Sequence, residues 1–168
     1  MKLKELFCAL CLYRSNFQNL HWNSVGENFD NAHKEISTDY YEMVSGTVDQ
    51  IAEMLTRFGV NPPNYVEVLD IIKSAEKDYL MVGSAQLYDR TTIIKLSDTM
   101  LKDIIDALVA CLDSDEMKQT LNAGIKSTLE AILEDYDLQY RYINKRKLSE
   151  VPAVAPVAPE ENSEDKSE

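Results

Sequence analysis

The segment from His21 to Glu53 constrains the fold of this chain more than any other, because it joins two amphipathic helices through a short turn. Apolar residues recur every three or four positions on both sides of the turn, which is the spacing of one buried helical face. The turn, 23–28, contains Gly26, which can adopt a positive φ, and Asn28, which is suited to cap the second helix. Two helices joined in this way must lie antiparallel or cross sharply.

This arrangement brings the two histidines of the chain, His21 and His33, near the same end of the helix pair. Further along the second helix, Asp49 and Glu53 are four positions apart, so both carboxylates lie on one helical face. Imidazoles and carboxylates together form a ligand set that non-haem iron accepts. Each pair also has a structural alternative, because histidines can pack in a helix interface and Glu53 can pair with Arg57 on the surface.

The same spacing predicts four long helices and a short one. We expect the long helices over residues 3–22, 29–58, 93–112 and 116–145, and a short helix over 65–77 between the second and the third. Gly59, followed by two prolines, ends the second helix, and residues 79–92 are expected to form an ordered loop. No segment shows the alternation of a β-strand, so the sequence predicts an all-α four-helix bundle.

The composition changes abruptly near the C-terminal end of the chain. Prolines recur every three or four residues from 152 onwards, and an acidic run follows them. Such a sequence excludes helix and has little to bury, so we expect a bundle domain over 1–147 and a disordered Pro/Ala-rich and acidic tail over 148–168. No apolar run approaches the roughly 20 residues that cross a bilayer, and no secretory signal is recognisable, which predicts a cytoplasmic protein without membrane association.

The net charge and the cysteine content limit the partners and the kinds of site that this chain can have. The net charge of −12 repels phosphate backbones and attracts cations, which argues against direct binding of DNA. An odd number of cysteines in a chain without a leader does not suggest a disulfide framework. Cys8 and Cys11 form a Cys-x-x-Cys that invites a redox or zinc interpretation. Because both lie in a helical apolar stripe without a second cysteine pair, we interpret them as core residues.

The two histidines belong to a longer motif, which consists of His21-Trp22-Asn23, Gly26, Asn28-Phe29 and His33. An Asp-x-x-x-Glu pair, Asp49 and Glu53, and then Gly59 follow this motif. This motif closely resembles that of the Dps family, the mini-ferritins or DNA-protecting proteins from starved cells. The resemblance implies a ferritin-like four-helix bundle of Dps type, with a short extra helix in the connection between the second and third helices. It also implies assembly through two-fold dimers into a hollow homododecamer that oxidises Fe(II) with peroxide or oxygen, stores the iron and protects against oxidative stress.

The resemblance assigns roles to individual residues. His21 and His33 would bind non-haem iron from one subunit, and the carboxylates of Asp49 and Glu53 would complete this ferroxidase site from its neighbour. Trp22 would lie beside the iron and can absorb oxidising equivalents.

Two departures from the family pattern bear on this assignment. Dps proteins usually carry an aspartate ligand one turn after the second histidine, where this chain has Ser37, a weak or vacant ligand position. Asp49 also follows His33 by 16 residues, one more than the usual interval. In a regular helix the extra residue would rotate the carboxylates by about 100°. We predict that a π-bulge at 45–47 takes up this rotation, because Gly46 lowers helix propensity and a hydroxyl flanks it on each side.

These departures leave two functions open. The first is the iron-oxidising and iron-storing activity, and the second is a structural or interaction protein of Dps fold with a degenerate iron site and no enzymatic activity. Direct DNA binding is not expected in either case. The tail carries a net charge of −4 from Val151 onwards, with five acids against Lys166, and the N-terminus offers two lysines before its helix begins.

Overall fold

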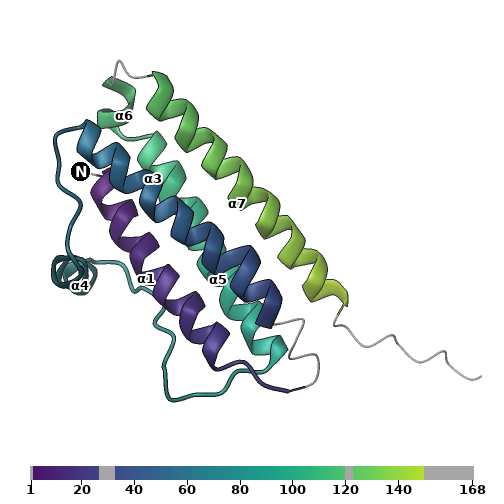
Figure 1. Ribbon diagram of the computed structural model, residues 1–168. Coiled ribbons are helices and arrows are strands. Elements are labelled where there is room, and N and C mark those ends of the chain that lie inside the picture. Colours follow the sequence, from purple (N-terminus) through teal and green to yellow (C-terminus); the bar gives the residue numbers. More distant parts are fainter. Residues whose placement is uncertain (1, 27–32, 120–122, 150–168) are drawn as a thin grey trace, which may run out of the picture.

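The computed structural model describes residues 2–26, 33–119 and 123–149, the side chains of 35–38 and 146–149 excepted. Four long rods lie side by side, and one short helix lies apart from them in a long connection (Figure 1). The described part is helical without a β-strand, so the prediction of a four-helix bundle with a short helix between its second and third rods is confirmed. The elements are α1 (Lys2–Trp22), η1 (Glu35–Glu42), α3 (Met43–Arg57), α4 (Tyr65–Ser74), α5 (Arg90–Leu112), α6 (Asp115–Gln119) and α7 (Ala123–Ser149).

The core of the bundle forms around α1, which contacts η1, α3, α4 and α5, while α5 packs against α7. Its fully buried side chains recur at the spacing of three and four residues that the sequence predicts. Burying one such side chain stabilises the fold by about 1.5–3 kcal/mol. Because six of these side chains lie along one stripe, this stripe of α1 faces the core. The stripe consists of Leu3, Leu6, Leu10, Tyr13, Phe17 and Leu20.

Some helix ends differ from the predicted ones for reasons visible in their caps. The helix α5 begins at Arg90, three residues early, because the Asp89 side chain accepts a hydrogen bond of 2.7 Å from the Thr92 N–H. The helix predicted over 116–145 corresponds to α6 and α7, and residues 120–122 lie outside the described part. The helix α7 reaches Ser149, two residues beyond the predicted domain limit. The tail after it lies outside the described residues.

The second rod, whose described part is residues 33–57, contains a π-helical stretch. This stretch does not lie at the position that was predicted from the sequence. The i→i+5 pattern occupies Glu35–Glu42, and Met43–Arg57 is a regular α-helix. The predicted bulge at 45–47 is therefore wrong in position. The Ser45 and Thr47 hydroxyls instead donate to carbonyls four residues earlier, at 2.7 and 3.0 Å, as in an ordinary α-helix.

The position of the π-helix preserves the phase of the rest of the rod. It lies between His33 and Asp49, which is the interval that contains one residue more than the family pattern. Beyond it, Val48 is buried, whereas Asp49 and Glu53 are exposed. Gly59 then ends the rod with a φ of 72°, as predicted.

The connection over 75–89, called the strap below, is fastened to α1 by hydrogen bonds rather than by helix packing. Asn16 is the main anchor, because its amide donates to the Leu80 carbonyl at 2.8 Å and accepts from the Val82 N–H at 3.1 Å. Near the end of α1, the Tyr88 N–H donates to the Asn23 carbonyl at 2.8 Å, next to the parallel bridge between Ser24 and Tyr88. The expectation of an ordered loop in this region is confirmed.

The cysteines lie in the core, as their spacing indicates. Cys8 and Cys111 are fully buried, and Cys11 packs against the same core. Burial raises the pKa of Cys8 to about 11 and that of Cys111 to about 12, which keeps both as unreactive thiols. None of the described helices combines the length and the apolar character needed to cross a lipid bilayer.

Candidate metal centre

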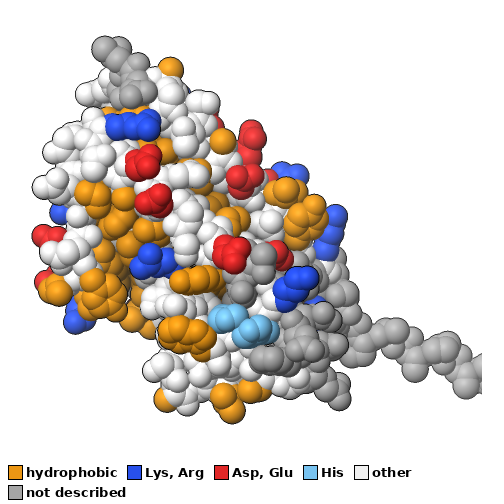
Figure 2. Space-filling view, viewed as in Figure 1, with side chains coloured by type: hydrophobic (Ala, Val, Ile, Leu, Met, Phe, Trp, Pro, Cys, Tyr) orange, Lys and Arg blue, Asp and Glu red, His pale blue; other side chains and the backbone are white. Residues whose placement is uncertain are grey.

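The two histidines meet at one end of the bundle, as the short turn predicts. His21 lies in the last turn of α1, and His33 is the first described residue of the second rod. Their rings stack with centroids 3.9 Å apart and planes inclined by 28°. Figure 2 shows both imidazoles, in pale blue, together on the molecular surface next to apolar side chains.

Each imidazole is oriented by the backbone of the other residue. The Nδ1 of His33 lies 3.2 Å from the His21 carbonyl oxygen, and the Nδ1 of His21 lies 3.4 Å from the His33 carbonyl oxygen. Because a carbonyl oxygen can only accept, each Nδ1 carries the hydrogen. This tautomer has its in-plane lone pair on Nε2, and metal-binding histidines in proteins are oriented in this way by a carbonyl or carboxylate.

The stacked geometry also defines what must change when a metal binds. A metal ion lies in the plane of each imidazole that holds it, about 2 Å from the nitrogen in zinc sites. The ring centroids are 3.9 Å apart and the ring planes are inclined by 28°. With the rings stacked in this way, no single position lies in both planes at that distance from both nitrogens. The rings must therefore turn relative to one another before both Nε2 atoms can bind one ion.

The two predicted carboxylates lie on the exposed face of α3, far from the histidines of the same chain. Asp49 follows His33 by sixteen positions, and at 1.5 Å per residue the two are therefore about 24 Å apart along the helix. Glu53 Oε2 lies 3.9 Å from Arg57 in an exposed ion pair, the alternative that its spacing allows. Among the described residues of one chain, no three of His, Cys, Asp and Glu come together in a way that could hold a metal ion.

The remaining predicted residues flank the histidine pair. Trp22 follows His21 directly, and its side chain is 65% exposed, which is unusual for tryptophan. The backbone of Ser37 belongs to η1, and its side chain lies outside the described residues.

A groove of about 360 Å³ runs between α1, α3 and α4, and sequence reasoning did not identify it. Arg14, Ser15 and Gln18 contribute polar side chains to this groove, besides the apolar residues given below. Tyr65 and Val66 are largely exposed at the start of α4 nearby. A capping box of Asn64 and Glu67 holds this first turn, and that motif followed by apolar residues was the available signal. The groove is lined mainly by Phe7, Cys11, Val48, Pro63, Tyr65 and Val68.

Comparison with known proteins shows which proteins this chain resembles in sequence and in fold. No protein-family model matches the chain. It is 28% identical, over 78% of its length and 81% of the other protein, to a DNA protection during starvation protein from Porphyromonas gingivalis. Its fold is similar to crystal structures of antigen TpF1 from Treponema pallidum (TM-score 0.73, 16% identity, 87% and 88% of the two chains) and of Mycobacterium smegmatis Dps (TM-score 0.70, 20% identity, 86% and 82%). The chain thus has the four-helix fold of these structures, and its similarity to the Porphyromonas gingivalis protein supports the resemblance to the Dps family that the histidine motif indicates.

Proposed function

We propose that this chain binds Fe(II), oxidises it with peroxide or oxygen and retains the iron inside a hollow homo-oligomer, as a dodecamer built from two-fold dimers. The histidine pair carries this proposal, because each Nδ1 is engaged by a backbone carbonyl, which directs the lone pair of each ring to Nε2. Two rings that pack for stability alone have no need of this reciprocal arrangement.

The other ligands come from a second copy of the chain in this proposal. Asp49 and Glu53 are exposed and lie about 24 and 30 Å along the helix from His33, so they cannot complete the site of their own chain and are available to a neighbour. The groove between α1, α3 and α4 and the exposed Tyr65 and Val66 offer partly apolar surface for that neighbour. A two-fold axis would then create two identical sites in each dimer.

Each ligand has a distinct task in the reaction. The Nε2 atoms of His21 and His33 bind Fe(II), and the carboxylates of Asp49 and Glu53 balance the charge that increases on oxidation to Fe(III). Two Fe(II) ions reduce one hydrogen peroxide, which takes up two protons and leaves as two waters. The negative charge of the chain attracts Fe(II) to the assembly.

Complementation between two inactive variants tests the shared site. His33→Ala and Asp49→Ala should each abolish Fe(II) oxidation, because each removes a ligand from every site. When the two variants are coexpressed, a mixed dimer contains one site with both mutations and one with neither. Random mixing should therefore restore roughly a quarter of the wild-type sites in two-fold dimers. Glu134→Ala, an exposed acid on α7, serves as the matched control.

The outcomes separate the alternatives. Restored oxidation in the mixture supports ligands from two chains. Wild-type oxidation without complementation places the whole site in one chain and refutes the proposed arrangement. Failure of the wild-type protein to bind or oxidise Fe(II) refutes the iron function itself.

The second candidate is a structural or interaction protein of Dps fold without iron chemistry. The Glu53–Arg57 ion pair favours it, because a carboxylate engaged on the surface is a weaker ligand, and Ser37 stands where the family has an aspartate. Native mass spectrometry after expression in iron-rich medium distinguishes the two, because this candidate gives an iron-free oligomer. A strictly monomeric protein at micromolar concentration refutes both.

We further propose that protection does not involve direct contact with DNA. The net charge of −12 repels phosphates, and the one basic run near the end of α7 adjoins an acidic segment. A gel shift with plasmid DNA at about 150 mM salt should show no binding, since basic contacts are needed to release counterions. Saturable binding without added divalent metal would refute this.

A further inference from the structure

Three ring pairs lie one above another along α1 and lead from the histidines into the core. Their members on α1 are four residues apart, so successive pairs are about 6 Å apart along the helix axis. The partner rings come from the second rod and from the strap. The pairs are His21–His33 at 3.9 Å, Phe17–Tyr40 at 5.4 Å and Tyr13–Tyr79 at 6.3 Å between ring centroids. These six residues are called the aromatic column below.

The column leads from a surface site into the dry interior. Tyr13 and Phe17 have no exposed surface, and Tyr40 is 2% exposed. Tyr40 and Tyr13 are phenols and can lose an electron, whereas Phe17 serves as a spacer between them. The two rings of each pair are in contact, and the steps of about 6 Å between successive pairs along α1 are short enough for an electron to pass from one pair to the next.

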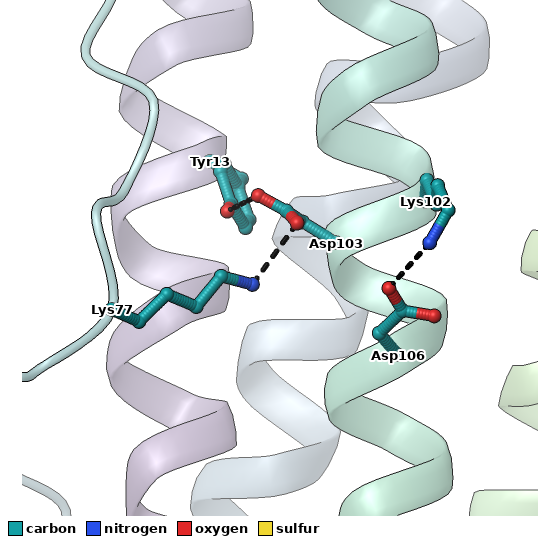
Figure 3. Close-up of polar contacts among 5 residues, drawn as sticks. All are labelled: Tyr13, Lys77, Lys102, Asp103 and Asp106. Atoms are coloured by element: carbon teal, nitrogen blue, oxygen red, sulfur yellow. Dashed lines mark hydrogen bonds and ion pairs between the residues drawn. The ribbon is translucent and has the colours of Figure 1, made fainter.

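The inner end of the column carries a base. The Tyr13 hydroxyl donates to Asp103 Oδ2 at 2.6 Å, and Lys77 Nζ lies 3.0 Å from the other oxygen, Oδ1 (Figure 3). Figure 3 shows Tyr13 and Lys77 reaching the same carboxylate from α1 and from the strap, while the Lys102–Asp106 pair lies elsewhere on α5. The lysine compensates the charge of the carboxylate, and the 2.6 Å contact places that carboxylate where the phenolic proton can go.

Tyr13 cannot release this proton in its resting state. Burial, and then the hydrogen bond to Asp103, raises the pKa of Tyr13 far above that of a free phenol. Oxidation reverses this preference, because a phenol that has lost an electron is a strong acid. Tyr136, the other fully buried tyrosine, differs in one respect: its hydroxyl donates at 3.2 Å to the Thr47 hydroxyl, which is not a base.

We propose that the aromatic column conducts oxidising equivalents from the histidine pair to Tyr13, which is oxidised to a neutral radical as its proton passes to Asp103. This rests on the proposed function for its oxidant, hydrogen peroxide reduced at an iron ion held by the histidines. It applies when only one Fe(II) is bound and a second electron is needed.

The electron balance is as follows. Hydrogen peroxide takes one electron from Fe(II), giving Fe(III), and one from Tyr13, and with two protons from solvent it becomes two waters. Tyr13 loses its O–H hydrogen as that electron and a proton, and the proton converts the Asp103 carboxylate to the carboxylic acid. Without this donor the second oxidising equivalent would be released as a damaging radical. The column therefore extends the protective role of the site to incomplete iron loading.

The first experiment needs no iron. The iron-free full-length protein is oxidised by flash-generated tris(bipyridine)ruthenium(III), and the radical is recorded by electron paramagnetic resonance. We expect a tyrosyl signal that is lost in Tyr13→Phe and kept in the matched variant Tyr136→Phe. Asp103→Asn keeps an oxygen that can accept the hydrogen bond but is a poor base, so its radical should form more slowly. In D₂O, radical formation should be slower in the wild type.

The second experiment supplies the natural oxidant. The protein with one Fe(II) per histidine pair is mixed anaerobically with an equal amount of hydrogen peroxide and frozen. We expect the same tyrosyl signal, diminished in Tyr40→Phe and absent in Tyr13→Phe, with more oxidised Trp22 in the latter.

The two experiments fail in different ways. A tyrosyl radical at Tyr13 after the flash but not with iron and peroxide supports the column and refutes the iron site as its oxidant source. Normal Fe(II) oxidation with radicals that persist in Tyr13→Phe leaves the proposed function standing and overturns this inference. A radical confined to Trp22 in the wild type also overturns it.

Discussion

The π-helix in the second rod should tolerate the deletion of one residue, whereas the regular α-helix that follows it should not. Deleting one residue from Glu35–Glu42, such as Thr38, should turn the i→i+5 pattern into ordinary α-helix. The residues on both sides would keep their phase, because the π-turn contains the one residue that the helix does not need. Deleting Gly46 removes a residue from the regular α3 instead and rotates the preceding segment by about 100°.

The magnitude follows from the side chains that this rotation would displace. Tyr40 is 2% exposed and Val44 is fully buried, and both precede Gly46. Losing the burial of two such side chains costs about 3–6 kcal/mol, at about 1.5–3 kcal/mol each. That is a large part of the roughly 5–15 kcal/mol by which a domain of this kind is stable. The Thr38 deletion removes neither contact and should cost less than about 1 kcal/mol.

Urea unfolding followed by circular dichroism measures both deletions, at one protein concentration because assembly contributes to stability. The Thr38 deletion also shortens the interval from His33 to Asp49 to the usual family length, so it should retain any Fe(II) oxidation of the wild type. If the two deletions destabilise the protein equally, the extra residue is not accommodated in η1 and the reasoning is wrong.

Three further predictions concern the strap, the cap of α5 and the thiols. Asn16→Ala should destabilise the protein by about 2–6 kcal/mol in urea unfolding, because it leaves two backbone groups of the strap unpaired at about 1–3 kcal/mol each. Asn19→Ala, which loses one bond of 3.2 Å, should cost about 1 kcal/mol or less. Hydrogen bonds from Thr92 lower the pKa of Asp89 in the folded protein. This carboxylate therefore stabilises the fold above its ordinary pKa of 3.8, and the contribution is lost as the pH falls through the lower pKa of the folded state. Melting curves of Asp89→Asn at decreasing pH should lack this loss of stability. Cys8 and Cys111 should resist a thiol reagent at about pH 8 until urea unfolds the protein, as counted by mass spectrometry.

The sequence predicted the π-turn correctly in kind and incorrectly in place, and the packing explains both. Counting residues between His33 and Asp49 reveals one too many, whatever the fold does with it. Its location was argued from local propensity, through Gly46 and its neighbouring hydroxyls. Tertiary contacts decided otherwise, because Tyr40, Val44 and Val48 are all buried at an unbroken spacing of four. The α-helical phase is thereby fixed over α3, from Val44 onwards, and the irregularity lies in η1, on the side of His33.

The candidate site was predictable to the same partial extent. A short turn between two amphipathic helices suffices to predict that His21 and His33 meet. The stacking of their rings and the reciprocal carbonyl contacts depend on how the backbone crosses at that turn, which no residue pattern specifies. The Asp103–Tyr13 contact joins residues 90 positions apart, and nothing in the spacing of either helix indicates it.

The division of the proposed site between two chains links iron binding to assembly. If His21 and His33 bind iron together with the carboxylates of a neighbour, then Fe(II) binds the dimer more tightly than the separated chain. By mass action, a ligand present at 100 times its dissociation constant stabilises the state that binds it by about 2.7 kcal/mol. Iron would then promote the assembly that stores it, and separated chains would hold the metal by two imidazoles alone. The stacked rings fit this order of events, because they must turn before they converge on one ion, and an arriving carboxylate face supplies the charge that favours the turn.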